Sequence, residues 1–293
     1  MGDTTGIQWT DHTFNPWVGC TKISAACDNC YAETWAKRAG SPELWQGDRR
    51  RTSNANWQKP MKWDRDAAAQ GRRARVFCAS LADFFDNQVP TRWRDDAWHR
   101  IDQTPNLEWQ LLTKRPENML KMLPTPAIGT PEWGEGWRNV WLGTTVENKA
   151  TLRRADVLRA IPAAVRFLSI EPLLEDIGEI DLSGISWIIV GGESGSSARP
   201  MHPEWARSLR DQCKAAGVPY FFKQWGEFIP CVTDDVGDGY RCFEDGAASP
   251  AFDEDAKHPV VTLEGQEMWR VGKARAGRFL DGREHSEFPE ARG

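Results

Sequence analysis

Three cysteines lie close together near the start of the chain. Cys20, Cys27 and Cys30 form a Cys-x6-Cys-x2-Cys pattern within eleven residues. Thiolates at this spacing can converge on a soft metal, and three ligands leave one coordination position open. Zinc in a closed structural site needs a fourth ligand, which His12 is near enough in sequence to supply. A four-iron cluster would instead keep one iron free to chelate a cofactor.

The other four cysteines are scattered, and we expect Cys78 and Cys213 to be small buried hydrophobes. The chain has seven cysteines, an odd number, and its first residues lack the basic and apolar regions of a signal peptide. These features favour free thiols or metal ligands over a disulfide framework and predict a cytoplasmic protein. Because no apolar run approaches the roughly 20 residues of a membrane span, we expect no membrane partner.

Short apolar or β-branched runs recur along the chain, and segments with helical signals separate them. The runs predict buried parallel strands at Phe14–Gly19, Arg75–Ala79, Trp109–Thr113, Val140–Gly143, Val165–Ser169, Trp187–Val190 and Tyr220–Lys223. Proline in a first turn and glycine after a last turn help to predict helices at Cys30–Ala39, Thr91–Asp102, Pro116–Met122, Asn148–Ala160 and Pro203–Ala216. This alternation predicts an α/β fold of about six or seven parallel strands, either a doubly wound sheet or a complete or partial barrel, and we expect the partial barrel.

Two stretches interrupt the alternation and set the predicted domain organisation. Residues 1–226 are predicted to form the α/β barrel, with an insertion at about residues 41–73, and residues 227–293 a C-terminal extension. The extension contains an acidic, glycine-rich segment between Asp234 and Asp255, followed by a basic segment at Arg270–Arg278. We expect the extension to pack on the barrel or to cover its mouth.

Several motifs carry a resemblance to a known family. They are Trp9–Asp11, Asn15–Lys22, Cys27–Glu33, Leu112–Pro116, Trp141–Asn148, Leu168–Leu174, Gly191–Gly195, Lys223–Gly226 and Gly277–Arg283. In these motifs the chain resembles a phage- and prophage-associated family of radical S-adenosylmethionine (SAM)-like proteins of unknown function. The usual spacing in the radical SAM superfamily is Cys-x3-Cys-x2-Cys, whereas this chain has six residues in the first gap.

This resemblance implies two cofactors and a reaction. The radical SAM-like fold would hold a [4Fe–4S] cluster on Cys20, Cys27 and Cys30, with SAM at the open iron. The implied enzyme cleaves SAM reductively to a 5′-deoxyadenosyl radical, which abstracts hydrogen from a substrate. An electron donor is therefore implied as well, and a partner protein is left open.

Polar residues follow the predicted strands, where a parallel barrel concentrates its chemistry. A bound SAM presents an ammonium, a carboxylate and ribose hydroxyls, so acidic, hydroxyl and basic groups are all needed around it. We expect Glu147 and Glu171 to contact its ribose or amine, with Asp83 the next choice. Gly191 and Gly192 would let the backbone approach it closely. The remaining cofactor-site candidates are Ser80, Thr113, Lys114, Ser169 and Glu193. Each polar side chain can instead cap a helix or brace a loop.

The insertion is basic, although the whole chain carries a formal charge of −5. Between Leu44 and Arg75, nine basic residues stand against three acidic ones. Basic side chains interleaved with the tryptophans Trp45, Trp57 and Trp63 are typical of a surface that neutralises phosphates and stacks bases. The substrate would then be a nucleic acid or nucleotide, although a solvated connection with packed tryptophans is the alternative. The candidate substrate contacts are Arg49, Arg50, Arg51, Lys223 and Trp225.

Two functions without radical chemistry also fit the sequence. The loop Gly191–Ser197 precedes a predicted helix and can cradle a phosphate. Combined with zinc on the cysteine triplet, it predicts a zinc-stabilised α/β protein that binds a phosphorylated ligand. The same zinc site also suits a nucleic-acid-binding module.

In many radical SAM proteins a Gly-Gly-Glu stretch follows the second strand and holds the SAM amine. Here Gly191-Gly192-Glu193 follows the sixth predicted strand, so that role is not carried over directly to these residues.

Overall fold

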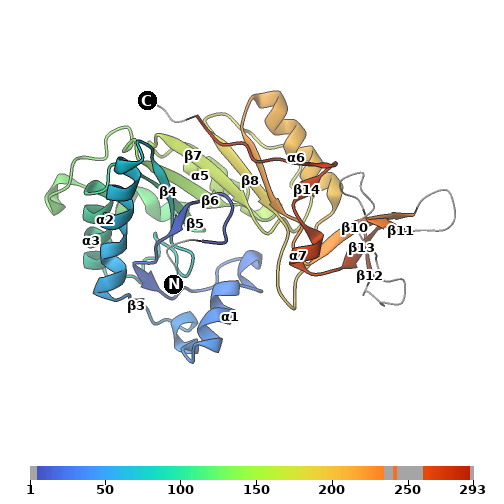
Figure 1. Ribbon diagram of the computed structural model, residues 1–293, viewed down its shortest axis with the longest axis horizontal. Helices are drawn as coiled ribbons and strands as arrows, with labels where there is room; N and C mark the ends of the chain where they lie inside the picture. The colour runs from blue at the N-terminus through green and yellow to red at the C-terminus, as the bar shows by residue number, and fades with distance from the viewer. Residues whose placement is uncertain (1–4, 234–239, 243–259, 291–293) are drawn as a thin grey trace. The chain divides into compact units, whose positions relative to one another are not determined.

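A parallel sheet organises the chain. The computed structural model describes residues 5–233, 240–242 and 260–290 (Figure 1). Seven strands join in the order β1-β4-β5-β6-β7-β8-β9. The pairs β1–β4, β4–β5, β5–β6 and β8–β9 are parallel. The predicted fold class, an α/β partial barrel of parallel strands, is therefore confirmed. The strands are β1 His12–Thr13, β4 Ala74–Cys78, β5 Leu107–Thr113, β6 Val140–Thr145, β7 Val165–Ile170, β8 Trp187–Gly191 and β9 Tyr220–Gln224.

Six of these strands, β4 to β9, lie where the apolar runs predict them. Every residue of β6 and β8 is buried. A strand that is covered on both faces needs apolar side chains at consecutive positions, which explains why these strands read as continuous runs without alternation.

The prediction for the first strand is wrong in its position. The sheet uses His12–Thr13 as its edge strand, whereas Trp17–Val18 (β2) pairs antiparallel with Arg50–Arg51 (β3). Between β1 and β2 the chain turns at Asn15-Pro16, because proline has no N–H for a strand ladder and restricts the residue before it. The Asn15 side chain then accepts a hydrogen bond from the Leu81 amide at 2.7 Å, which ties this turn to the segment after β4.

Two predicted helices are confirmed in full, namely α3 (Thr91–Asp102) and α6 (Pro203–Ala216). Helix α6 ends at Gly217, whose φ of +66° suits a residue without a side chain. The other predicted helices are shorter than expected or begin with a 3-10 turn. They are α1 Tyr31–Arg38, α4 Met119–Met122 after the 3-10 turn Pro116–Asn118, and α5 Arg153–Arg159 after the 3-10 turn Lys149–Thr151.

The insertion contains a helix that the sequence analysis did not predict. Helix α2 spans Asn54–Ala69, and the Ser53 hydroxyl accepts a hydrogen bond from the Asn56 amide at its start. Pro60 lies inside it and removes one backbone donor, which obscured the helical pattern. Trp57, Pro60 and Trp63 are nevertheless three residues apart and share the buried face of the helix. This helical spacing is the sequence feature from which the helix could have been predicted.

The C-terminal extension forms a small antiparallel sheet. Its strands run in the order β11-β10-β13-β12, and α7 (Lys273–Ala276) with the hairpin β14–β15 follows. Beyond the hairpin, the chain lies against β9, where the Phe222 amide donates to the His285 carbonyl at 2.9 Å. The predicted acidic segment from Asp234 to Asp255 lies largely outside the described residues. The strands are β10 Phe228–Thr233, β11 Tyr240–Cys242, β12 Val260–Leu263, β13 Gln266–Arg270, β14 Phe279–Leu280 and β15 Arg283–Glu284.

The chain divides into two compact units. Unit 1 comprises residues 1–145, 153–168 and 290–293, and unit 2 comprises residues 146–152 and 169–289. Most described tryptophans are core residues in one unit or the other, as expected, and Cys78 and Cys213 are fully buried. None of the helices in the described residues combines the length and apolar character needed to cross a membrane.

Candidate functional site

The cysteine loop of unit 1 follows β2 and lies against the segment that comes after β4. The Gly19 amide donates to the Leu81 carbonyl at 3.1 Å, and Gly19 pairs with Ala82 just after β4. The φ of Gly19 is +116°, and a Cβ there would lie 2.5 Å from the Asp48 carbonyl oxygen, so only glycine fits. The loop ends at Cys30, the residue directly before the first turn of α1.

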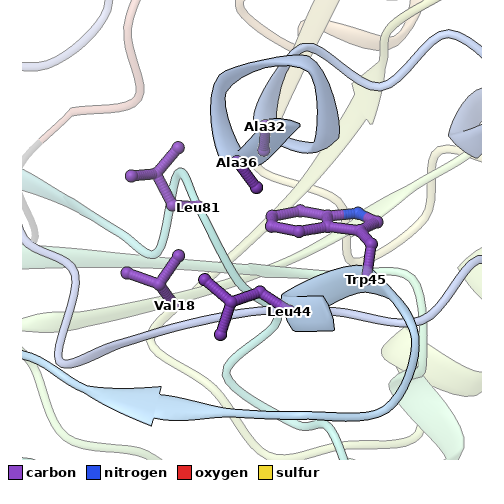
Figure 2. Close-up of a cluster of buried hydrophobic side chains, with 6 residues drawn as sticks. All are labelled: Val18, Ala32, Ala36, Leu44, Trp45 and Leu81. Atoms are coloured by element: carbon purple, nitrogen blue, oxygen red, sulfur yellow. The ribbon is translucent and has the colours of Figure 1, made fainter. Parts of the chain in front are cut away.

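Two of the three cysteines share one apolar cluster. Figure 2 shows this cluster, which consists of Val18, Ala32, Ala36, Leu44, Trp45 and Leu81. Cys20 and Cys30 pack against it from opposite ends of the loop, and Cys27 is buried. Within the described residues, no three His, Cys, Asp or Glu side chains are gathered closely enough to hold a metal ion. The His12 ring, the candidate fourth zinc ligand, stacks on Trp63 with 4.4 Å between ring centroids.

A charged network adjoins the first of these cysteines. Arg115, two residues after β5, donates to the Cys20 Sγ at 3.7 Å and to the Asp83 carboxylate at 2.9 Å. Asp83 also accepts from the Thr113 hydroxyl at 2.5 Å and from the Lys114 amide at 3.1 Å. The predicted site residues Asp83, Thr113 and Lys114 thus lie together, and the arginine that joins them to Cys20 was not among the predicted site residues.

The Cys20 thiol is strongly influenced by this environment. Burial raises the pKa of the Cys20 thiol to about 11, and the Asp83 carboxylate acts in the same direction, whereas Arg115 opposes both. Without a metal, Cys20 is therefore protonated at neutral pH. Metal binding requires the thiolate, so a bound metal must displace this proton.

The structure of the insertion differs in two respects from the predicted surface for binding nucleic acid. The Arg49 side chain is only 2% exposed and forms an ion pair with Asp86 at 2.5 Å. The tryptophans Trp45, Trp57 and Trp63 are all buried, so they are not platforms for stacking bases. Their apolar rings gain more from the core of unit 1 than from an exposed surface. Of the arginine triplet, Arg50 is exposed, and the Arg51 guanidinium lies over the Trp57 ring at 3.8 Å.

In unit 2, an ion pair joins the ends of two predicted strands. The Lys223 ammonium, in β9, lies 3.0 Å from a carboxylate oxygen of Glu171, which follows β7. A Cβ on Gly191 would lie 2.6 Å from the same carboxylate, so the glycine makes room for Glu171. Glu147 and Ser169 are also buried in unit 2, and the Ser169 carbonyl accepts from the Val146 amide at 3.1 Å.

The glycine-rich loop of unit 2 contacts its own chain. A Cβ on Gly192 would lie 1.9 Å from the Trp225 carbonyl oxygen, so the close approach that Gly192 permits is to this backbone. Trp225 is itself buried, and its indole N–H donates to the Phe279 carbonyl at 2.8 Å. The cofactor role of Gly192 and the substrate role of Trp225 stay predictions.

Carboxylates occupy the donors that a phosphate would use in this loop. The Gly195 amide donates to Glu227 at 2.9 Å, and the Arg199 amide and guanidinium both donate to Glu193. Since these anions belong to the protein, the loop does not offer the Gly195 and Arg199 amides as a ready phosphate cradle. The arrangement weighs against the phosphorylated-ligand alternative.

The fold and the cysteine loop define an α/β protein of parallel strands with charged side chains at the strand ends. Residues 4–289 match the family described as Protein of unknown function (DUF5131), and the chain belongs to that family. The predicted resemblance to a family of unknown function is confirmed to this extent, whereas the phage association stays a prediction. No curated protein matches the chain.

Solved structures of spore photoproduct lyase are similar to this chain. A mutant with bound AdoMet and dinucleoside spore photoproduct aligns with a TM-score of 0.43 and 11% identity, over 89% of this chain and 68% of that chain. The lyase complexed with dinucleoside spore photoproduct aligns with a TM-score of 0.40 and 12% identity, over 87% and 66%. A further mutant gives 0.41 and 12%, over 68% and 71%.

Proposed function

We propose that the chain is a radical SAM enzyme that holds a [4Fe–4S] cluster on Cys20, Cys27 and Cys30. One observation carries this proposal: the cysteine loop follows β2, and Gly19 at its start pairs in parallel with Ala82, four residues beyond the carboxyl end of β4 in the parallel sheet. Ligands and catalytic groups in such sheets lie at this end of the strands. The residue types fit the group, because thiolates suit iron–sulfur clusters, and an arginine N–H points at the Cys20 sulfur. In the described residues the three sulfurs are not gathered around one point, so binding would have to draw the loop together.

Cys20, Cys27 and Cys30 would hold the cluster, which would supply the electron for reductive cleavage of SAM to methionine and a 5′-deoxyadenosyl radical able to abstract hydrogen from a substrate. The protein's own residues bind and orient the reactants. Asp83 holds Arg115, and Arg115 holds the start of the cysteine loop. In unit 2, Lys223 holds the carboxylate of Glu171 in one position. The proposed reaction also requires an electron donor that reduces the cluster. A partner protein could serve as this donor.

Glu171 and Glu147 are proposed to accept hydrogen bonds from the SAM amine or ribose. Glu171→Gln keeps the size of the side chain but removes its charge, so the SAM dissociation constant of the reconstituted protein should rise about tenfold, as expected for a hydrogen bond to a charged group. Glu147→Gln should act in the same direction. Isothermal titration with SAM measures the change.

The matched control for these variants is Glu204→Gln, because Glu204 lies on α6 in an exposed pair with Arg207. It should leave SAM affinity unchanged. If Glu171→Gln loses its iron, the residue is structural, and if SAM affinity is unaltered, the residue does not contact the cofactor.

The zinc-stabilised alternative predicts a different metal. Elemental analysis of protein purified without oxygen should find iron and sulfide if the proposal holds. Zinc in stoichiometric amount, with no uptake of iron on reconstitution, would favour the structural zinc site.

We propose a nucleic acid or nucleotide as the substrate, since exposed basic residues lie near the cysteine loop, namely Lys37 and Arg38 at the end of α1 and Arg50, which pairs with Val18 in the β2–β3 ribbon. Replacing Lys37, Arg38 and Arg50 together by Ala should weaken binding of single-stranded DNA or RNA. If all three contact phosphates, the slope of log K against log salt should flatten by about 2. Fluorescence anisotropy at several salt concentrations measures both quantities.

A charge-matched triple variant separates a local site from the general charge of the protein. Its positions are exposed lysines elsewhere in the chain, namely Lys121, Lys149 and Lys214. This control should keep the salt slope of the wild type. Equal losses in both triple variants, or no binding at low salt, would shift the proposal to a small-molecule substrate.

A further inference from the structure

Two arginine–aspartate pairs converge on the residue that follows the first cysteine. Arg115 donates to the Thr21 carbonyl at 2.8 Å, and Arg49 donates to the Thr21 hydroxyl at the same distance. Asp83 holds Arg115 at 2.9 Å, and Asp86 holds Arg49. Thr21 is thus fixed through both its backbone and its side chain. We call these four charged residues the Thr21 clamp.

The clamp is assembled from distant parts of the chain. Both aspartates come from the segment after β4, whereas Arg49 comes from the insertion and Arg115 from the end of β5. All four side chains are at most 8% exposed. Burying two ion pairs is costly and gives little net stability, so the arrangement calls for a reason other than stability. The clamp lies beside Cys20, so the reason we consider is that it holds this cysteine in place.

Arg115 also reaches the cysteine itself. The same nitrogen that pairs with Asp83 lies 3.7 Å from the Cys20 Sγ. An N–H donor held on a ligand sulfur both orients the ligand and raises the reduction potential of an iron–sulfur cluster, because it stabilises the more negative reduced state.

We infer that the Thr21 clamp positions Cys20 before any metal binds, and that Arg115 is the donor that sets the potential of a cluster held there. The second half of this inference rests on the proposed function. The first half concerns the chain alone and is tested on the metal-free protein.

Amide hydrogen exchange in residues 20–30 of the metal-free full chain tests the clamp. Arg115→Lys keeps the charge but loses the fork that reaches both Asp83 and Thr21, so exchange in the loop should rise about tenfold. Asp83→Asn should raise it in the same direction, and it provides a second variant if Arg115→Lys folds poorly. The control is Arg154→Lys, which alters another buried arginine, one that donates to the Thr145 carbonyl. It should leave loop exchange within about twofold of the wild type.

Unchanged loop exchange in both Arg115→Lys and Asp83→Asn would overturn the clamp, as would an equal rise in Arg154→Lys. For the cluster, a redox titration followed by electron paramagnetic resonance should give Arg115→Lys a lower midpoint potential than the wild type, with equal iron content. An unchanged potential would remove Arg115 as the determinant. If the wild type takes up no iron, the proposed function fails, whereas the exchange result still decides the clamp.

Discussion

Replacing Cys20, Cys27 or Cys30 by Ala should abolish uptake of the proposed [4Fe–4S] cluster. Wild-type protein reconstituted without oxygen should contain about four irons per chain, and each single variant should contain almost none, because a three-thiolate site that loses one ligand no longer holds the cluster. Iron and sulfide analysis, with the visible absorption of the reconstituted protein, measures the loss.

The control for the cysteine variants is Cys213→Ala. Cys213 is fully buried on α6 in unit 2, so its replacement costs some packing but should leave iron content unchanged. Full iron in any one of the three loop variants would show that the cysteine replaced there is not a ligand.

Arg49→Ala should be the most destabilising change in the predicted basic surface. It leaves the Asp86 carboxylate buried without its ion-pair partner, and removal of one partner from a buried pair costs about 3–5 kcal/mol. Urea unfolding, followed by tryptophan fluorescence, should show a correspondingly lower midpoint. A loss of nucleic-acid binding in this variant would therefore report unfolding and not a lost phosphate contact.

Arg50→Ala is the comparison, since Arg50 is the neighbouring residue and is exposed. Its effect on the free energy of unfolding should stay within about 0.5 kcal/mol. Equal stability of the Arg49 and Arg50 variants would contradict the burial and pairing of Arg49.

The strands were predictable because a strand buried on both faces requires a continuous run of apolar residues in the sequence. Val140–Gly143 and Trp187–Val190 are continuous apolar runs, and they became the fully buried strands β6 and β8. The first strand was misplaced because its two sheet residues, His12 and Thr13, are only partly buried and have no apolar run. The aromatic run that follows them serves the core and a separate two-stranded ribbon.

The site was predictable by position but not by pairing. Strand ends identified Asp83 and Glu193 as polar candidates, since parallel strands bring their carboxyl ends to one edge. Arg115 also follows a strand end, but its pairing with Asp83 was not predicted, and Arg199 was not identified as the partner of Glu193. A hydrogen bond between side chains leaves no periodic signal in the sequence. Arg49 illustrates the same limit, because composition indicated an exposed charge and the fold buries it against Asp86.

The release of 5′-deoxyadenosine tests the central claim most directly. Protein reconstituted with iron and sulfide is mixed with SAM and dithionite without oxygen, and the products are quantified by mass spectrometry, with the Cys30→Ala variant as the blank. We predict that the wild type forms 5′-deoxyadenosine and methionine in equal amounts, and that the blank forms neither. A wild-type protein that carries its full complement of iron yet leaves SAM intact would contradict the assignment as a radical SAM enzyme.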